Sequence, residues 1–156
     1  MKLLYGTLGA LMGVMSFANA ADITIFYSPT CPHCHHARDF IKNELIYEYD
    51  DLNVNEINAT VADNREFFRE TLNKCKYESG GVPVLVIGDK CFQGYGDSLR
   101  DAIRASIEVD LTDAQKQSAI SNRKELQENR DTFISVHSDR LNAIVNHDED
   151  DDVKKN

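Results

Sequence analysis

The feature that most limits how this chain can fold is a pair of cysteines, Cys31 and Cys34, placed directly after a strand-like segment. Residues 23–27 are β-branched or aromatic, which favours a strand, and Ser28 and Pro29 then indicate a turn. Apolar residues return at helical spacing after the second cysteine. The pattern predicts a strand, a short loop and a helix that begins at the first cysteine.

This position would change the chemistry of the first thiol. Pro32 suits the first turn of a helix, because its missing N–H would have no partner there. The unpaired N–H groups and the dipole of a helix N-terminus favour an anion, so we expect the pKa of Cys31 to fall below the free value of about 8.5. Cys31 is therefore the predicted nucleophile, and Cys34, one turn further in, is the predicted resolving cysteine.

Three other interpretations of these cysteines stay open. With His35, the pair also fits the Cys-x-x-Cys-His motif that attaches haem, although every methionine of the chain lies in its first 15 residues. Zinc or copper could bind the two cysteines with His35 and His36, but no second Cys/His pair is spaced to complete such a site. A structural disulfide would close too short a loop to contribute much stability. The pattern favours a redox pair without a resident metal.

The remaining apolar pattern predicts an α/β order over residues 21–109. Gly88 and Asp89 form a predicted tight turn between the last two strands. The predicted elements are a strand at 23–27, a helix from 32 to about 45, a strand at about 46–54, a helix at about 59–73, strands at 82–87 and 91–92, and a helix from Asp97 or Ser98.

Pro83 stands at the head of the most apolar strand, directly after Gly80, Gly81 and Val82. A cis Val82–Pro83 bond and an ordinary proline at the start of a strand are both compatible with this position. In the cis form, the backbone of Val82 would turn toward the cysteines and could pair with an extended peptide or with glutathione.

Two segments resemble the dithiol glutaredoxins, which have the thioredoxin fold. They are residues 26–34 with Ala37, and residues 82–94 with Asp97, about fifty residues apart as in that family. The resemblance covers about residues 22–108 and implies an α/β three-layer domain in which helices flank a four-stranded mixed sheet. It also implies a nucleophilic Cys31 and a cis Pro83. The implied substrate or glutathione contacts are at Thr30, Val82, Gly94 and Asp97.

The central histidine of the motif points to a second group of the same superfamily. His33 makes the sequence Cys-Pro-His-Cys, which is similar to that of the periplasmic disulfide-forming oxidases. In those enzymes the histidine helps to stabilise the thiolate and makes the disulfide more oxidising. Three positions differ from most glutaredoxins: Ser28 replaces a lysine, Gly81 a threonine, and Gln93 the first glycine of a Gly-Gly pair.

The first 20 residues have the layout of a cleavable export signal. Lys2 precedes an apolar stretch at 3–17, and small residues at 18 and 20 follow. The stretch is shorter than the roughly 20 residues that cross a bilayer. We therefore expect a periplasmic or secreted protein without a membrane span after cleavage. The formal net charge of −9 disfavours nucleic acid and anionic membranes as partners.

Four cysteines in an exported chain favour disulfides. Cys75 ends a predicted helix and Cys91 opens a predicted strand, so we expect a structural Cys75–Cys91 bridge, with a second redox pair as the alternative. Beyond the α/β domain, residues 110–146 predict a helical extension that opens with a capping box, and residues 147–156 predict an acidic disordered tail.

The sequence thus predicts an exported thiol–disulfide oxidoreductase that exchanges disulfides with cysteine-containing proteins through Cys31 and Cys34. A redox partner is expected, and glutathione is a candidate co-substrate; no other cofactor is expected. One alternative is a secreted glutaredoxin that reduces disulfides with glutathione. The other is a non-catalytic metal-binding or chaperone-like protein whose acidic helical end makes the contacts.

Overall fold

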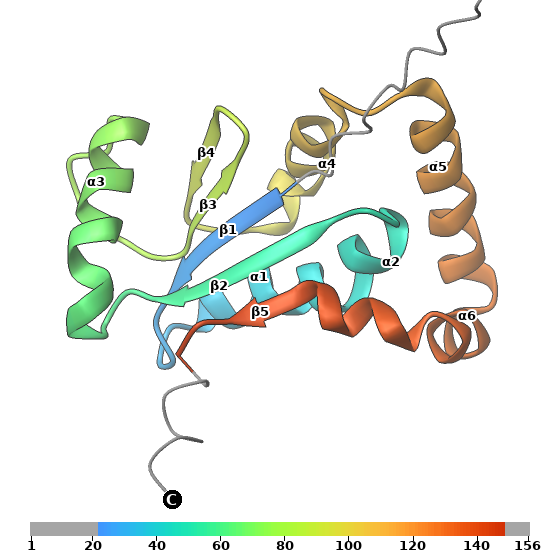
Figure 1. Cartoon of the computed structure of the whole chain (residues 1–156), viewed down its shortest axis with the longest axis horizontal. Helices are drawn as coiled ribbons and strands as arrows, with labels where there is room; N and C mark the ends of the chain where they lie inside the picture. The colour runs from blue at the N-terminus through green and yellow to red at the C-terminus, as the bar shows by residue number, and fades with distance from the viewer. Residues whose placement is uncertain (1–21, 149–156) are drawn as a thin grey trace, which may run out of the picture.

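The computed structural model describes residues 22–148, which form a five-stranded mixed sheet with helices on both faces (Figure 1). The strand order is β4-β3-β1-β2-β5. β1 runs parallel to β2 and antiparallel to β3, and β5 runs parallel to β2. The strands are β1 (Asp22–Tyr27), β2 (Asn53–Asn58), β3 (Val84–Ile87), β4 (Lys90–Gln93) and β5 (Ile144–Asn146).

The helices of the first part form the outer layers, and the later ones run along one end of the sheet (Figure 1). α1 (Pro32–Phe40) continues through a π-helical turn (Ile41–Leu45) into α2 (Ile46–Glu48). The others are α3 (Arg65–Cys75), α4 (Arg100–Glu108), α5 (Asp113–Glu128) and α6 (Arg130–Val136), with 3-10 turns at Ala62–Asn64, Asp97–Leu99 and Ser138–Ala143.

Alternation along β1 separates two apolar layers. Ile23 and Ile25 point to the side of α1 and α4, where they are fully buried in the main core. Phe26 points to the opposite side, where it meets Phe67 and Phe68 of α3 at ring-centroid distances of 5.3 and 5.1 Å. Because successive side chains of a strand face opposite sides, one short strand anchors helices on both faces of the sheet.

The expected strand at 46–54 is wrong except at its last two residues, 53 and 54. Residues 46–48 form α2, and the strand begins only at Asn53. Ile46 is fully buried, and Glu48, at 1 % exposure, pairs with Arg104 at 2.6 Å and with Arg123 at 2.9 Å. These contacts to α4 and α5 override the β propensity of the segment, which depends on packing more than on the backbone.

The C-terminal region also differs from the expectation. The four-stranded sheet has a fifth strand, because residues 144–146 of the expected helical extension pair with β2. The expected disordered tail is wrong for His147 and Asp148, which are held against β2. Asp148 accepts hydrogen bonds from the Asn58 N–H at 2.7 Å and from the Asn64 amide at 2.9 Å. The rest of the tail and the expected signal at 1–20 lie outside the described residues.

Candidate active site

Cys31 and Cys34 lie at the N-terminus of α1, as the sequence predicts. They form a disulfide with Cα atoms 5.2 Å apart. Cys31 is the N-cap residue and is partly exposed, whereas Cys34 is 1 % exposed. The Cys34 N–H donates to Cys31 Sγ at 3.1 Å, so sulfur takes the place of the usual capping oxygen. The same N–H would stabilise a thiolate at Cys31 once the disulfide is reduced.

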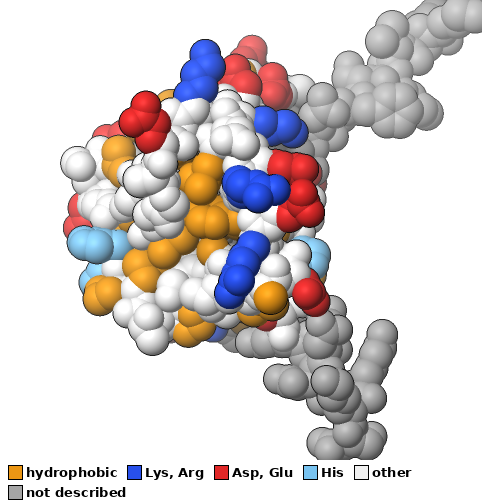
Figure 2. Space-filling model, turned by 90° about the vertical axis from the view of Figure 1, so that its left-hand side faces the viewer, with side chains coloured by type: hydrophobic (Ala, Val, Ile, Leu, Met, Phe, Trp, Pro, Cys, Tyr) orange, Lys and Arg blue, Asp and Glu red, His pale blue; other side chains and the backbone are white. Residues whose placement is uncertain are grey.

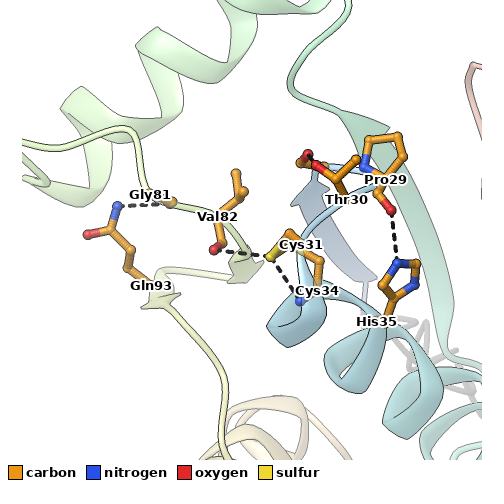
Figure 3. Close-up of a disulfide and its surroundings, with 9 residues drawn as sticks. Pro29, Thr30, Cys31, Cys34, His35, Gly81, Val82 and Gln93 are labelled. Carbon is orange, nitrogen blue, oxygen red and sulfur yellow. Dashed lines mark hydrogen bonds between the residues drawn. A yellow bond between two sulfur atoms is a disulfide. The ribbon is translucent and has the colours of Figure 1, made fainter.

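Local hydrogen bonds hold the loop that leads into this helix. The Cys31 N–H donates to the Ser28 carbonyl at 3.2 Å, which closes a turn. His35 Nε2 lies 2.9 Å from the Pro29 carbonyl oxygen and so joins α1 to the loop (Figure 3). Pro32 is the first residue of α1, and His33 and its neighbours at 35 and 36 are exposed. The Cys31 sulfur is therefore partly exposed because Cys31 stands at the very start of α1.

A second segment, which leads into β3, the strand next to β1, lies beside Cys31 (Figure 3). The Val82–Pro83 bond is cis, and Pro83 is buried while Val82 is half-buried. The Val82 carbonyl oxygen lies 3.6 Å from Cys31 Sγ. Pro83 in turn accepts a hydrogen bond from the Gly94 N–H at 2.8 Å, and Gly94 has a φ of +83°. The backbone before β3 thus lies directly beside the exposed sulfur.

The other predicted binding residues lie less close together. Thr30 is exposed, with its hydroxyl 3.3 Å from that of Ser28. Asp97 is exposed and forms an ion pair with Arg100 at 3.2 Å. The described contacts join Val82, Pro83 and Gly94 to the cysteine site, whereas they join Asp97 to the start of α4.

The sequence did not predict a polar network that connects α1 with the neighbouring strands of the sheet. Arg38, one turn after Cys34, contacts both carboxylate oxygens of the buried Glu56 at 3.0 and 2.6 Å. The Arg38 guanidinium also lies 4.2 Å from the ring centroid of Tyr27, whose hydroxyl accepts from Asn146 at 3.0 Å. Burial raises the pKa of Tyr27. The signal in the sequence was an acid at an inward position of β2, which needs a basic partner.

Gln93 is a second residue that sequence reasoning did not place at the site. Its Nε2 donates to the Ser79 carbonyl at 2.7 Å and to the Gly81 carbonyl at 3.0 Å. Both carbonyls belong to the loop that precedes Val82, and Figure 3 shows the bond to Gly81. Nothing in the residues around this glutamine predicts that its side chain donates hydrogen bonds to a preceding loop.

Cys75 and Cys91 form a second disulfide, with an S–S distance of 1.99 Å and Cα atoms 5.8 Å apart. It joins the last residue of α3 to β4. The 16-residue separation encloses Val82 and Pro83, so this bridge closes the loop that carries the second segment of the site.

Residues 22–148 contain neither a side-chain cluster suited to a metal ion nor a helix suited to a bilayer. No group of three or more His, Cys, Asp or Glu side chains in this range is arranged to hold a metal ion. None of the helices described there is long and apolar enough to cross a membrane.

A mixed sheet, a cysteine pair at the start of α1 and a cis proline before β3 define a thioredoxin-like α/β protein. A protein-family model for glutaredoxin matches residues 23–92, from β1 into β4. Together these findings confirm the predicted thioredoxin-like fold, with a glutaredoxin-like arrangement over the matched residues.

Similarity to known proteins is otherwise limited. The solved structure of a glutaredoxin from Archaeoglobus fulgidus is 22% identical and covers 62% of this chain and 99% of its own, with a TM-score of 0.41. No curated protein sequence matches the chain.

Proposed function

We propose that this protein is a thiol–disulfide oxidoreductase that exchanges disulfides with cysteine-containing proteins through Cys31 and Cys34. One observation carries the proposal: Cys31 Sγ caps α1, accepts the Cys34 N–H at 3.1 Å and lies 3.6 Å from the Val82 carbonyl. A sulfur held this way is exposed, stabilised as an anion and next to backbone that can pair with a client. The glutaredoxin match over residues 23–92 supports the same class of reaction.

The exchange proceeds through a mixed disulfide. In the oxidising direction, a client thiolate attacks Cys31 Sγ, the S–S bond to Cys34 breaks, and Cys34 leaves as a thiolate. A second client thiolate then attacks the client sulfur and releases Cys31. The client loses two electrons and two protons, and the protein's disulfide gains the two electrons. Reduction of a client is the reverse, with Cys31 attacking and Cys34 resolving.

The surface near the site favours a polypeptide client over a small polar thiol. Apolar side chains gather in the middle of the face that α3 occupies (Figure 2). Phe67 is 50 % exposed there, and Phe68 and Leu72 are partly buried. A Cβ at Gly80 would lie 3.8 Å from Phe68 and 3.9 Å from Leu72, so this apolar surface reaches the loop before Val82. Apolar segments of an incompletely folded chain are its natural partners.

We extend the proposal to place and direction. The basic start, short apolar run and small residues before Ala21 support export to the periplasm or outside the cell. His33 in the first turn of α1 supports a role in forming disulfides, because an imidazole beside Cys31 can stabilise the reduced, thiolate form. A redox partner would restore the starting state, and glutathione is the candidate small-molecule partner. No resident cofactor is needed for the reaction.

The test is to trap the intermediate. Cys34→Ser should accumulate mixed disulfides with client proteins through Cys31, because the resolving thiol is gone. Cys31→Ser should trap none, and the double variant Cys75→Ser/Cys91→Ser should exchange disulfides as the unmodified protein does. Non-reducing electrophoresis and mass spectrometry identify the linked cysteines.

The reduction potential of the Cys31–Cys34 pair then decides the direction. A value near about −120 mV indicates an oxidant and one near about −270 mV a reductant. A folded protein that exchanges disulfides with neither protein thiols nor glutathione would contradict the proposal. In that case, metal titration of the two variants tests the non-catalytic alternative.

A further inference from the structure

The loop from Ser79 to Val82 determines which backbone groups lie next to the sulfur of Cys31. It contains two consecutive glycines, Gly80 and Gly81, both exposed, and glycine has the least restricted backbone of all residues. The Val82 carbonyl at its end lies 3.6 Å from Cys31 Sγ. A loop of this composition needs contacts from outside itself if Val82 is to stay at that distance.

Gln93 supplies those contacts. It is the last residue of β4, and its Nε2 donates one hydrogen to the Ser79 carbonyl at 2.7 Å and the other to the Gly81 carbonyl at 3.0 Å. One side chain therefore satisfies an acceptor at the beginning of the loop and another directly before Val82. A Cβ added at Gly81 would meet Gln93 Nε2 at 3.6 Å, an ordinary contact distance, so the Gln93 amide lies on the side of Gly81 that a larger residue would occupy.

The neighbouring backbone strengthens this arrangement. The Gly94 N–H donates to the Pro83 carbonyl at 2.8 Å, and Gln93 itself pairs with Val84 across the two strands. Residues 93 and 94 thus hold the chain on both sides of the cis Val82–Pro83 bond. β3 and β4 are paired along their length and form a rigid element. The residues that hold the loop are therefore fixed in place themselves.

We propose that Gln93 is a positioning residue for substrate: its amide fixes the Ser79–Val82 loop so that the Val82 backbone can pair with an extended client while the client's sulfur meets Cys31. This inference rests on the proposed function. Gln93 does not touch the reacting sulfurs, so it acts on binding. Preorganised backbone pairs with less loss of conformational entropy, which strengthens binding without altering the chemistry at Cys31.

The side-chain requirement is specific. Both partners are carbonyl oxygens, so the position needs a group with two hydrogens to donate, and an amide has them. Glutamate has the same shape but would set an ionised carboxylate against two carbonyl oxygens. Alanine would remove both hydrogen bonds, and water would then donate to the two carbonyl oxygens instead. We therefore expect Gln93→Glu to impair client binding more than Gln93→Ala.

Steady-state kinetics with two substrates test the role. With a disulfide-containing peptide, Gln93→Ala should raise KM about tenfold and leave kcat within about twofold, since loss of two neutral hydrogen bonds can account for such a change. With 2-hydroxyethyl disulfide, a linear disulfide that has no peptide backbone to pair, the rate should not change. The reduction potential of Cys31–Cys34 should equal that of the unmodified protein. Gln127→Ala, at an exposed glutamine of α5, is the matched control.

Amide hydrogen exchange gives a readout independent of activity. The Gly81 and Val82 amides should exchange faster in Gln93→Ala and in Gln93→Glu than in the control variant, with amides of β1 unaffected. An unchanged peptide KM in both variants overturns the positioning role, whether or not the loop loosens. An inactive unmodified protein is a different result, which overturns the proposed function and this inference with it.

Discussion

The two disulfides of this molecule sit at opposite ends of helices. Cys31 caps the N-terminus of α1, where free N–H groups and the helix dipole favour a thiolate. Cys75 is the last residue of α3, where the carbonyl end of the dipole disfavours a thiolate. The first bridge spans three positions of the chain and the second spans sixteen. The same covalent bond is thus placed for exchange in one region and for restraint in the other.

The two disulfides also differ in the backbone that lies around them. At the first bridge, the Val82 carbonyl lies 3.6 Å from the partly exposed sulfur of Cys31. At the second, the bridge connects α3 with β4, two elements that enclose the loop carrying Val82. Under the proposed function, the Cys75–Cys91 disulfide thus supports the segment that binds the client of the Cys31–Cys34 disulfide.

The largest expected effect comes from removing each pair in turn. Cys31→Ser should reduce disulfide exchange with a peptide substrate to the uncatalysed rate, because the nucleophilic sulfur is lost. The double variant Cys75→Ala/Cys91→Ala should keep most of its exchange rate once folded. Stopped-flow or fluorescence assays of peptide reduction measure both. Equal losses in the two variants, with both proteins folded, would remove the distinction between the pairs.

The second effect concerns stability. Cys75→Ala/Cys91→Ala should lower the free energy of unfolding by about 3 kcal/mol, because the bridge restricts the unfolded chain over a loop of this length. Cys31→Ala/Cys34→Ala should have a smaller effect, since its loop is much shorter. Guanidinium unfolding under non-reducing conditions measures both. A larger loss from the Cys31–Cys34 pair would mean that it too is mainly structural.

A third change sharpens the electrostatic part of the comparison. His33→Ala should make the reduction potential of Cys31–Cys34 more negative by about 30 mV, equivalent to about 1.4 kcal/mol, because the Cys31 thiolate of the reduced form loses a neighbouring imidazole. His36→Ala, also exposed and on the same helix, is the control and should have less effect. Equilibration with glutathione redox buffers gives the potentials. Equal shifts in the two variants would show that position within the motif is unimportant.

The smallest expected effect lies at the end of α3. Lys76 follows Cys75 with a φ of 59°, a left-handed conformation that favours glycine. Lys76→Gly should therefore raise the free energy of unfolding by about 0.5–1 kcal/mol and leave the exchange rate unchanged. Thermal and denaturant unfolding measure the gain. A change in exchange rate would mean that this helix end influences the active site more directly than its contacts indicate.

The features that sequence reasoning reached were local. A strand, a turn, a proline at the first helical position and a capping cysteine all leave their mark within a dozen residues, and the structure has each of them around Cys31. The segment at Val82 and Pro83 was identified by its glycines and apolar run. Its cis bond was one of two readings, because nearby sequence does not fix the isomer.

Long-range contacts were out of reach. β5 has only three residues, and its pairing with Val54 is ninety positions away, so nothing nearby in the sequence indicates it. The helical conformation at residues 46–48 depends on Arg104 and Arg123 reaching Glu48 from other helices. The Gln93 contacts depend on how a loop folds back over a strand. Each of these is decided by tertiary packing, which a single sequence does not display.

The late strand has a consequence for how the chain is made. β2 is complete at Asn58, yet the edge that β5 covers stays bare until residues 144–148 have been synthesised. A nascent chain with all its cysteines already present would expose an unpaired strand edge. Such an edge can form backbone hydrogen bonds with other chains and lead to aggregation. A released fragment ending before residue 144 should therefore aggregate more readily in solution than one that includes residue 148.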